Sequence, residues 1–567
     1  MDNERGVIQG SILGPFLWNV FIDDLISELE STGTGCKLPG SDLRACSSWF
    51  ADDGGVFEHT CEGLQRQLDV CTAWAERNRI RFSPRKSVVM WLVKPSVLSG
   101  EYARVGNERL TLHGTQLAVV EKFCYLGIDI LGNGLLTAHC SESKINRATT
   151  RLDQLRSMLH GEHGLSPRIG LQIVRAKLNT VLLYGCDILP PHPQADKVQR
   201  KALRQVVAAY DRTHNWFLYS ELGESRISTL ALVHFVSAAA RFVASLTPVS
   251  RAVAMLIKRA LEEPVHEVVT QTKLIPWQQR LRECLRKLLF GTGDQVRVLF
   301  HVPQPELKQV LKIGVKSGTA QERNSDSLVD RRVNVRAMLT LFAGNSAIGL
   351  DVCKLLLHIS DKRLAFSQRD QVVFGKHYDE LRVVATCVKA VAKTLALQCE
   401  HRWWCDEAID ARFPVTRIAG PGEGQPYLTQ FSVPHAAIAF LFRTGSFNPL
   451  DVVTKHGSEL DCRLCGESRG DTPLHLVGLC NGGEDEKRKR QLERLRNITR
   501  AVFGQSDLTD WSDVVYGLVG RTRGVSAKAL SRERVLEGCQ LLYEFYTLRR
   551  NAKAAAVSRA VEAANVH

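Results

Sequence analysis

The sequence predicts an α/β segment at the N-terminus, followed by a mainly α-helical region and a small zinc-binding module near the C-terminus. Short β-like runs alternate with amphipathic helical stretches up to about residue 130. From residue 141 onward apolar residues recur three or four positions apart, which is typical of helices packed on a core. Closer to the C-terminus, three cysteines and a histidine lie within 19 residues, as the ligands of a metal site would.

The length and charge of the chain suggest several domains and a polyanionic partner. At 567 residues the chain is too long for one core, and roughly three or four domains are expected. The hydrophobic content of 44% and the charged content of 24% are those of a folded protein. A net charge of +14 suits nucleic acid, because cationic side chains release counterions from phosphates. Many folded proteins are basic without such a partner, so the charge alone leaves this open.

The cysteine usage and the N-terminus indicate an intracellular protein. The sixteen cysteines are scattered along the chain, and no apolar core follows Met1 as in a signal peptide. No uninterrupted apolar run is long enough to cross a bilayer. We therefore expect a nuclear or cytoplasmic protein that is not secreted and has no membrane partner; its oligomeric state stays open.

The first element is a helix through Phe16–Leu25, with Pro15 in its first turn, where a missing N–H costs little. Asp23 and Asp24 are expected on the surface at the end of this helix. A short apolar lead-in, Cys46–Ala51, then brings the chain to an acidic pair at a tight turn. Gly54 and Gly55 are expected to give this turn its backbone freedom.

Downstream elements follow from the same periodicities. Leu64, Leu68, Cys71 and Trp74 are spaced three or four apart and predict an amphipathic helix over 61–77. Strands are expected at 87–93 and 123–130. A helical stripe follows, formed by Ile145, Ala148, Leu152, Leu155 and Leu159, and another runs over 171–183. Helical pieces continue to about residue 415, and a Gly/Pro-rich linker occupies 420–425.

The acidic pair Asp52–Asp53 carries the most chemical information. Adjacent carboxylates on a turn can hold divalent metal, and Mg²⁺ prefers a few carboxylates completed by substrate oxygens. An Asp-Asp pair alone is most often part of a solvated loop. The neighbouring motifs therefore determine whether this pair is interpreted as a metal site.

Four motifs stand in order around the acidic pair. Gln9-Gly10 precedes a helix, Asp52-Asp53 follows roughly forty residues later, Trp74, Asn78, Phe82 and Lys86-Ser87 come next, and Tyr125-Leu126-Gly127 closes the series. Together they resemble the palm of a reverse transcriptase of the non-LTR (LINE-type) retrotransposon class. The resemblance implies catalytic roles for Asp52, Asp53 and Lys86. It also implies that Gln9 and Gly10 lie against the template and nucleotide, and that Tyr125 and Gly127 belong to the primer grip.

The resemblance extends beyond the palm and suggests a domain plan. Segments 182–188 and 199–223 are similar to the thumb and post-thumb helices of these elements, whose basic side chains could track a template-primer backbone: Arg175, Lys177, Lys197, Arg200, Lys201 and Arg204. The expected fold is an α/β partial polymerase palm over 1–130 and thumb helices over 131–250. A helical region of unknown role over 251–419, a zinc segment over 420–485 and basic helices over 486–567 complete it.

The cluster Cys462-x2-Cys465-x9-His475-x4-Cys480 has four soft ligands and predicts a closed structural Zn²⁺ site. Buried free cysteines with an incidental histidine are the alternative. In the resembled family such a segment follows an Arg-Thr-Gly, matched here at 443–445. A second group, Cys399, His401 and Cys405, lacks a fourth ligand on a helix-like stretch and is interpreted as core.

The resemblance also indicates what the chain would need. Such palms carry a further metal-binding aspartate upstream of the Gln-Gly motif, and only eight residues precede that motif here. We expect RNA-directed DNA synthesis from an RNA template, a DNA primer and deoxynucleoside triphosphates, with Mg²⁺ or Mn²⁺, as the activity of the family. The isolated chain is expected to be truncated and inactive. The alternative is a non-enzymatic, zinc-containing nucleic-acid-binding remnant. An RNA-directed RNA polymerase is disfavoured because Ala51 stands where glycine is usual.

Overall fold

The computed structural model describes most of the N-terminal half and selected helices beyond it. The described residues are 11–38, 44–92, 109–132, 139–159, 164–262 apart from 210, 212 and 246, 276–290, 352–365, 374–410 and 485–503, with Leu428, Ala436, Ala437 and Phe440. The Gln9-Gly10 motif, the linker at 420–425, the tripeptide 443–445 and the cysteine-histidine cluster at 462–480 lie outside them.

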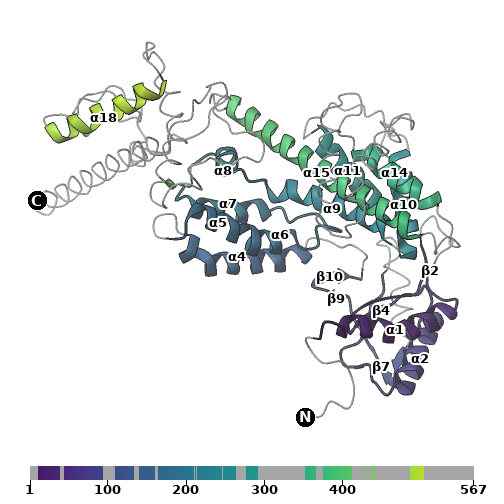
Figure 1. The fold of residues 1–567 in the computed structure, drawn as a ribbon. Coiled ribbons are helices and arrows are strands. Elements are labelled where there is room, and N and C mark those ends of the chain that lie inside the picture. The colour runs from purple at the N-terminus through teal and green to yellow at the C-terminus, as the bar shows by residue number, and fades with distance from the viewer. Residues whose placement is uncertain are drawn as a thin grey trace, which may run out of the picture.

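The N-terminal part is an α/β unit in which two helices pack beside short paired strands (Figure 1). Its helices are α1 (Gly14–Ser31) and α2 (Cys61–Arg77). Its strands are β1 (Cys36–Lys37), β2 (Arg44–Ala45), β3 (Ser47–Phe50), β4 (Asp53–Val56), β5 (Val88–Val89), β6 (Thr111–Leu112), β7 (Thr115–Gln116), β8 (Ala118–Val119), β9 (Lys122–Tyr125) and β10 (Ile128–Leu131). In the described residues each strand pairs with one other, β5 with β8 in parallel and the rest antiparallel.

Helix α2 shows why the periodicity succeeded as a predictor. Thr60 caps its N-terminus by accepting a hydrogen bond from the Gly63 N–H at 3.1 Å, which satisfies one of the open donors there. Its apolar side chains lie on one face, where Leu68, Cys71 and Trp74 are buried. The predicted bounds 61–77 are confirmed.

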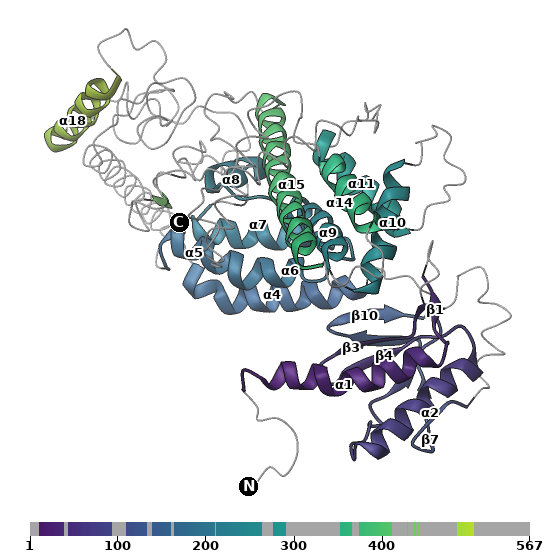
Figure 2. The ribbon, with the colours of Figure 1, turned by 45° about the vertical axis from the view of Figure 1, so that its right-hand side comes forward.

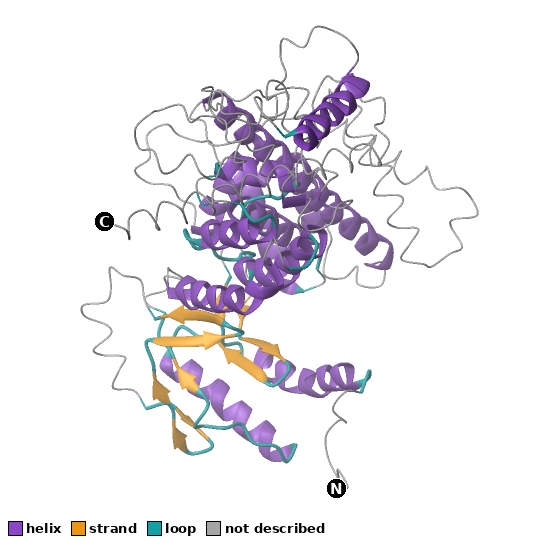
Figure 3. Cartoon of the chain, turned by 90° about the vertical axis from the view of Figure 1, so that its left-hand side faces the viewer, coloured by secondary structure: helices purple, strands orange, loops and turns teal. Residues whose placement is uncertain are grey.

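Every strand of the described residues is grouped with α1 and α2 in one part of the molecule, and the regular elements described elsewhere are helices (Figure 3). These helices are α4 (His139–Leu159), α5 (Pro167–Ile173), the π-helix η2 (Val174–Asn179), α6 (Thr180–Leu183), α7 (Ala195–Val206), α8 (Asn215–Leu222), α9 (Ile227–Ala244), α10 (Pro248–Glu262), α11 (Pro276–Phe290), α14 (Val352–Ala365), α15 (Phe374–Asp410) and α18 (Glu486–Phe503). The prediction of a mainly helical chain is confirmed.

The apolar side chains form separate clusters. One lies within the N-terminal unit around Trp74, a second joins α4 to α8, and a third joins α9, α10, α11, α14 and α15. The predicted stripe on α4 is buried in the second cluster at all five positions. Helix α9 takes part in both helical clusters and also contacts α15 along its length, so it is the central helix of this region.

Helix α9 is also the one described helix that is long and apolar enough to cross a membrane. Its 18 residues have a mean hydropathy of 1.6, but 67% of them are buried inside the protein. The sequence search for uninterrupted apolar runs missed this helix, because Ser, Thr, His and Arg interrupt it. Its packing is that of a core helix.

Three local predictions need correction. Asp23 and Asp24 are exposed as expected, but they lie in the middle of α1, since the helix continues to Ser31. The strand expected at 87–93 is paired only at Val88–Val89 within the described part. Between Leu171 and Leu183 the helix is not uniform, because η2 inserts a π-helical segment between α5 and α6.

Candidate functional site

The acidic pair lies at the tip of the β3–β4 hairpin. Phe50 pairs with Asp53, so Ala51 and Asp52 form a two-residue turn. Ala51 has a φ of 52°, a conformation that costs a non-glycine residue about 1 kcal/mol or more. Its carbonyl oxygen accepts a hydrogen bond from Nε1 of Trp18 at 2.7 Å. Helix α1 therefore holds the turn that exposes both carboxylates to solvent.

The glycines after the acidic pair do not form the turn, contrary to the prediction. Gly54 and Gly55 lie in β4, and neither has a positive φ. Gly54 pairs with Trp49 across the hairpin, and a Cβ at position 54 would lie 2.2 Å from Cζ3 of the indole ring. Gly54 is thus required for the packing of Trp49 on the neighbouring strand, which sequence inspection could not distinguish from a turn glycine.

A row of aromatic rings packs between the β3–β4 hairpin and the helices α1 and α2. Trp18 contacts Phe21 with ring centroids 5.6 Å apart, and Phe21 contacts Trp74 at 5.2 Å. Phe82 lies 6.4 Å from Trp74 and 5.9 Å from Trp49. Because these rings come from α1, α2, the loop after α2 and β3, they fix the base of the hairpin against both helices.

The motif that follows the acidic pair has a structural part and an exposed part. Asn78 donates from Nδ2 to the Trp74 carbonyl at 2.9 Å, which closes the end of α2. Ser87 donates from Oγ to the Ser83 carbonyl at 2.9 Å and stabilises the turn at 84–86. Lys86 is exposed on this turn, where a mobile ammonium could reach an anionic ligand.

The predicted primer-grip motif forms the β9–β10 hairpin. Tyr125 pairs with Ile128, so Leu126 and Gly127 are the two turn residues, with φ values of 48° and 74°. Positive φ at both positions is the geometry of a type I′ turn, which matches the twist of a hairpin. The Tyr125 hydroxyl is buried and finds no hydrogen-bond partner among the described residues. Lys122 forms an ion pair with Asp129 at 2.8 Å, and the hydrogen bond from Lys122 holds the pKa of Asp129 below its usual value.

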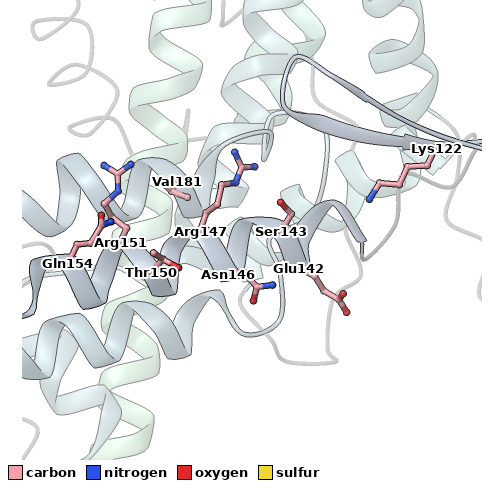
Figure 4. Close-up of a pocket in the computed structure, with 9 residues that line it drawn as sticks. All are labelled: Lys122, Glu142, Ser143, Asn146, Arg147, Thr150, Arg151, Gln154 and Val181. Carbon is pink, nitrogen blue, oxygen red and sulfur yellow. The ribbon is translucent and has the colours of Figure 1, made fainter. Parts of the chain in front are cut away.

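A groove of about 700 Å³ lies between this hairpin and α4. Figure 2 shows the hairpin on the side of the N-terminal unit that faces α4. In Figure 4, Arg147 and Arg151 extend from the same side of α4, and Lys122 lies at the far end of the groove. Except for Val181, the residues that line the groove are polar or charged: Lys122, Glu142, Ser143, Asn146, Arg147, Thr150, Arg151 and Gln154. Hydroxyl, amide and guanidinium donors of this kind suit phosphate oxygens.

Within the described part of the chain, no group of three or more His, Cys, Asp or Glu side chains is arranged to hold a metal ion. Asp52 and Asp53 supply two exposed carboxylates, so they could contribute to a Mg²⁺ site only together with other ligands. Cys399, His401 and Cys405 also fail to form a site. Cys399 Sγ lies 3.1 Å from the Leu288 carbonyl, and Cys405 packs against the apolar cluster. All three side chains are half-buried, so the group lies at the edge of the core and the interpretation as core holds only in part.

The structure thus describes five of the predicted polymerase residues and brings them to two hairpins and one turn: Asp52, Asp53, Lys86, Tyr125 and Gly127. Gln9 and Gly10 lie outside the described residues, as do all four predicted zinc ligands. Sequence reasoning missed Trp18, Arg147 and Arg151. For the two arginines a signal existed, since their spacing of four places them on one side of a helix.

Comparison with known proteins shows what the N-terminal part is similar to. Residues 2–130 match the reverse transcriptase (RNA-dependent DNA polymerase) family. A retrovirus-related Pol polyprotein from the type-1 retrotransposable element R1 2 of Nasonia vitripennis is 25% identical over 166 residues, 28% of this chain and 37% of the relative. The RNA-directed DNA polymerase from the mobile element jockey of Drosophila funebris is 27% identical over 232 residues, 37% of this chain and 23% of the relative. The Pol polyprotein of the R2 element of Nasonia vitripennis is 33% identical over 130 residues, 22% of this chain and 12% of the relative.

The chain therefore spans well under two thirds of the length of these relatives. The matched residues include the tips of both hairpins and the aromatic row beside the β3–β4 hairpin. Residues 2–130 are therefore similar to reverse transcriptases, and the relatives that match the chain are proteins of retrotransposable and mobile elements.

Proposed function

We propose that the chain binds a template-primer duplex of RNA and DNA, as part of the machinery that performs RNA-directed DNA synthesis in a non-LTR retrotransposon. The observation that carries this proposal is the polar, basic groove beside the β9–β10 hairpin. The hairpin would face the primer end, and α4 would follow the duplex backbone with Arg147 and Arg151. Such contacts fix the position of a duplex without reading its sequence.

Because the groove carries basic side chains, its affinity for a primer-template should depend on the salt concentration. Each phosphate contact that is lost should reduce the slope of log K against log salt by about 1. We would measure the affinity for a fluorescent primer-template over a series of KCl concentrations. Arg147→Gln and Arg151→Gln should weaken binding and flatten the salt dependence. Arg156→Gln is the matched control, because Arg156 is an exposed arginine of the same helix that does not line the groove. Equal effects of all three substitutions would contradict the proposal.

For the chemical step, the family implies divalent metal and the exposed pair Asp52–Asp53 offers two ligands. Mg²⁺ bound there would stabilise the developing charge on the transferred phosphoryl group. The chain's own contribution is a turn held by Trp18, which presents both carboxylates at the tip of the β3–β4 hairpin. Primer extension on an RNA template, with loss of extension in Asp52→Asn, tests this role directly.

A second candidate function is nucleic-acid binding without catalysis. It is supported by the finding that no third carboxylate, histidine or cysteine joins Asp52 and Asp53 in the described part. Under this alternative, salt-sensitive binding survives Asp52→Asn and no extension product forms. Extension above the level of Asp52→Asn would eliminate it.

The proposed Zn²⁺ site rests on the spacing of Cys462, Cys465, His475 and Cys480 alone. Four such ligands would close a tetrahedral structural site that helps the C-terminal part to grip nucleic acid. The purified chain should contain about one zinc ion per molecule, and Cys462→Ser should lose it. Zinc content that is unchanged by Cys462→Ser would rule the site out. We expect the whole chain to act inside the cell, where the thiols stay reduced.

A further inference from the structure

Tyr184 makes an unusual contact for an exposed aromatic residue. The residue comes directly after α6, and its side chain contacts a turn 58 residues earlier in the chain. There its hydroxyl donates a hydrogen bond to the carbonyl oxygen of Leu126. The residue is 49% exposed, so burial alone does not explain why the ring lies in this position.

The ring of Tyr184 also covers the second residue of the same turn. A Cβ at Gly127 would lie 3.4 Å from Cε1 of the Tyr184 ring, so the glycine and the ring are in close contact. Leu126 and Gly127 are the two residues that must hold positive φ for the type I′ turn. Tyr184 therefore contacts the turn at both of its conformationally demanding positions.

The backbone of Tyr184 is anchored in turn by Lys144 of α4. The Lys144 ammonium donates to the Tyr184 carbonyl at 2.6 Å and lies 5.9 Å from the centroid of the tyrosine ring. Lys144 is only 7% exposed, so its position is fixed by packing. Gly185, with a φ of 72°, lets the chain turn directly after the anchored residue. A chain of contacts thus connects α4, through Lys144 and Tyr184, to the tip of the β9–β10 hairpin.

The hairpin needs such an external contact. In the described residues β9 pairs only with β10, and an isolated two-stranded hairpin is marginally stable in water. A hydrogen bond to the turn carbonyl and a ring over the turn glycine both restrict how far the tip can move. These contacts come from the helix end next to the groove, so the tip and the groove are fixed relative to each other.

We propose that Tyr184 is a positioning residue, which holds the Leu126–Gly127 turn at a fixed place relative to the α4 groove so that the hairpin meets the recessed 3′ end of a primer. This inference rests on the proposed template-primer binding. Tyr184 itself is not assigned a contact with nucleic acid; it acts through the hairpin. Lys144 acts one step further away, through the backbone of Tyr184.

The mechanical part of the proposal can be tested without nucleic acid. Hydrogen exchange of the hairpin amides, measured by mass spectrometry on the full chain, should be roughly 3- to 10-fold faster in Tyr184→Phe, which lacks only the hydroxyl. Lys144→Met should act in the same direction. The control is Arg241→Gln, which removes an ion pair to Asp187 in the same loop at 3.2 Å but does not touch the hairpin. Unchanged exchange in Tyr184→Phe, or an equal increase in Arg241→Gln, would overturn the inference.

The functional part is tested by comparing two duplexes of equal length, one with a recessed primer 3′ end and one blunt. A general loss of stability would weaken binding to both equally. Tyr184→Phe is expected to weaken the recessed duplex roughly 3- to 10-fold and leave the blunt one unchanged. Faster hairpin exchange with equal effects on both duplexes would show that Tyr184 holds the hairpin but that the hairpin does not recognise a primer end. That result refutes the positioning role. Absence of duplex binding by the wild-type chain would instead refute the proposed function.

Discussion

Replacing Gly54 by alanine adds only one methyl group, but it should strongly destabilise the β3–β4 hairpin that carries the acidic pair. The new methyl group would lie 2.2 Å from Cζ3 of Trp49, where real carbon atoms stay about 3.5 Å apart or more. Backbone strain is not involved, because Gly54 has no positive φ. The indole ring would have to leave its place beside Phe82, and overpacking of this kind costs about 1–3 kcal/mol.

The neighbouring glycine provides the control. At Gly55 a Cβ would find its nearest atom, Cζ of Phe57, at 3.4 Å, which is an ordinary contact. Gly55→Ala should therefore be neutral, or stabilising by about 0.4–1 kcal/mol through the unfolded state. The two alanine variants should differ by about 2 kcal/mol, or roughly thirtyfold in local opening.

Hydrogen exchange of the amides at 47–56 is the suitable assay. The chain has several separate apolar clusters, so global unfolding is not expected to be two-state and would not report on one hairpin. Exchange in this segment follows local opening directly. Equal exchange in Gly54→Ala and Gly55→Ala would refute the argument that Gly54 is needed for the packing of Trp49.

Three further predictions concern other parts of the chain. Trp18→Phe keeps a ring beside Phe21 but removes the hydrogen-bond donor to the Ala51 carbonyl. Hydrogen exchange of the turn amides should therefore be about fivefold faster, which corresponds to a loss of about 1 kcal/mol in local stability. Exchange as slow as in the wild type would contradict this. Burial raises the pKa of the Glu400 carboxyl above 4.5, although the nearby Arg226 guanidinium acts in the opposite direction. Protonated Glu400 therefore contributes its full stability to the folded state below about pH 4.5. This contribution is lost as the pH rises through the pKa of Glu400 in the folded state. The free energy of local opening of α15 around Glu400, measured by hydrogen exchange, should therefore fall less in Glu400→Gln than in the wild type over this window, and parallel pH profiles would count against it. Phe16 is 64% exposed on a face of α1 that also exposes Leu17 and Val20, so Phe16→Ser should reduce self-association in sedimentation experiments; self-association equal to that of the wild type would contradict this.

The elements that local sequence specifies were predicted well. The bounds of α2 follow from Thr60 as a cap and from the spacing of Leu68, Cys71 and Trp74. The α4 stripe was predicted for the same reason, because a helix that packs on a core must repeat its apolar residues three or four apart. These features depend on residues within about two helical turns of one another, so a single sequence contains the information.

The features that the sequence did not predict depend on contacts between residues that are far apart in the chain or lie on opposite strands. The role of Gly54 depends on which residue it meets across a hairpin, and the sequence shows a glycine beside an acidic turn in either case. Trp18 contacts a carbonyl 33 residues away and Tyr184 one that is 58 residues away. No periodicity predicts such contacts, since they are decided by how helices are placed over hairpins. The candidate site was thus predictable as a set of motifs, while the residues that support it were not.

Both hairpins of the candidate site have the same design, and this bears on how the site works. Each tip contains a non-glycine residue at positive φ, Ala51 in one and Leu126 in the other. In each case the carbonyl of that residue accepts a hydrogen bond from an aromatic side chain, that of Trp18 within α1 or that of Tyr184 directly after α6. A strained turn persists only where its surroundings hold it, and here the holding group is attached to a rigid element. The two tips are therefore positioned by helices α1 and α6 rather than by their own strands, which are too short to do so. Losing either aromatic donor should release one tip without unfolding the other.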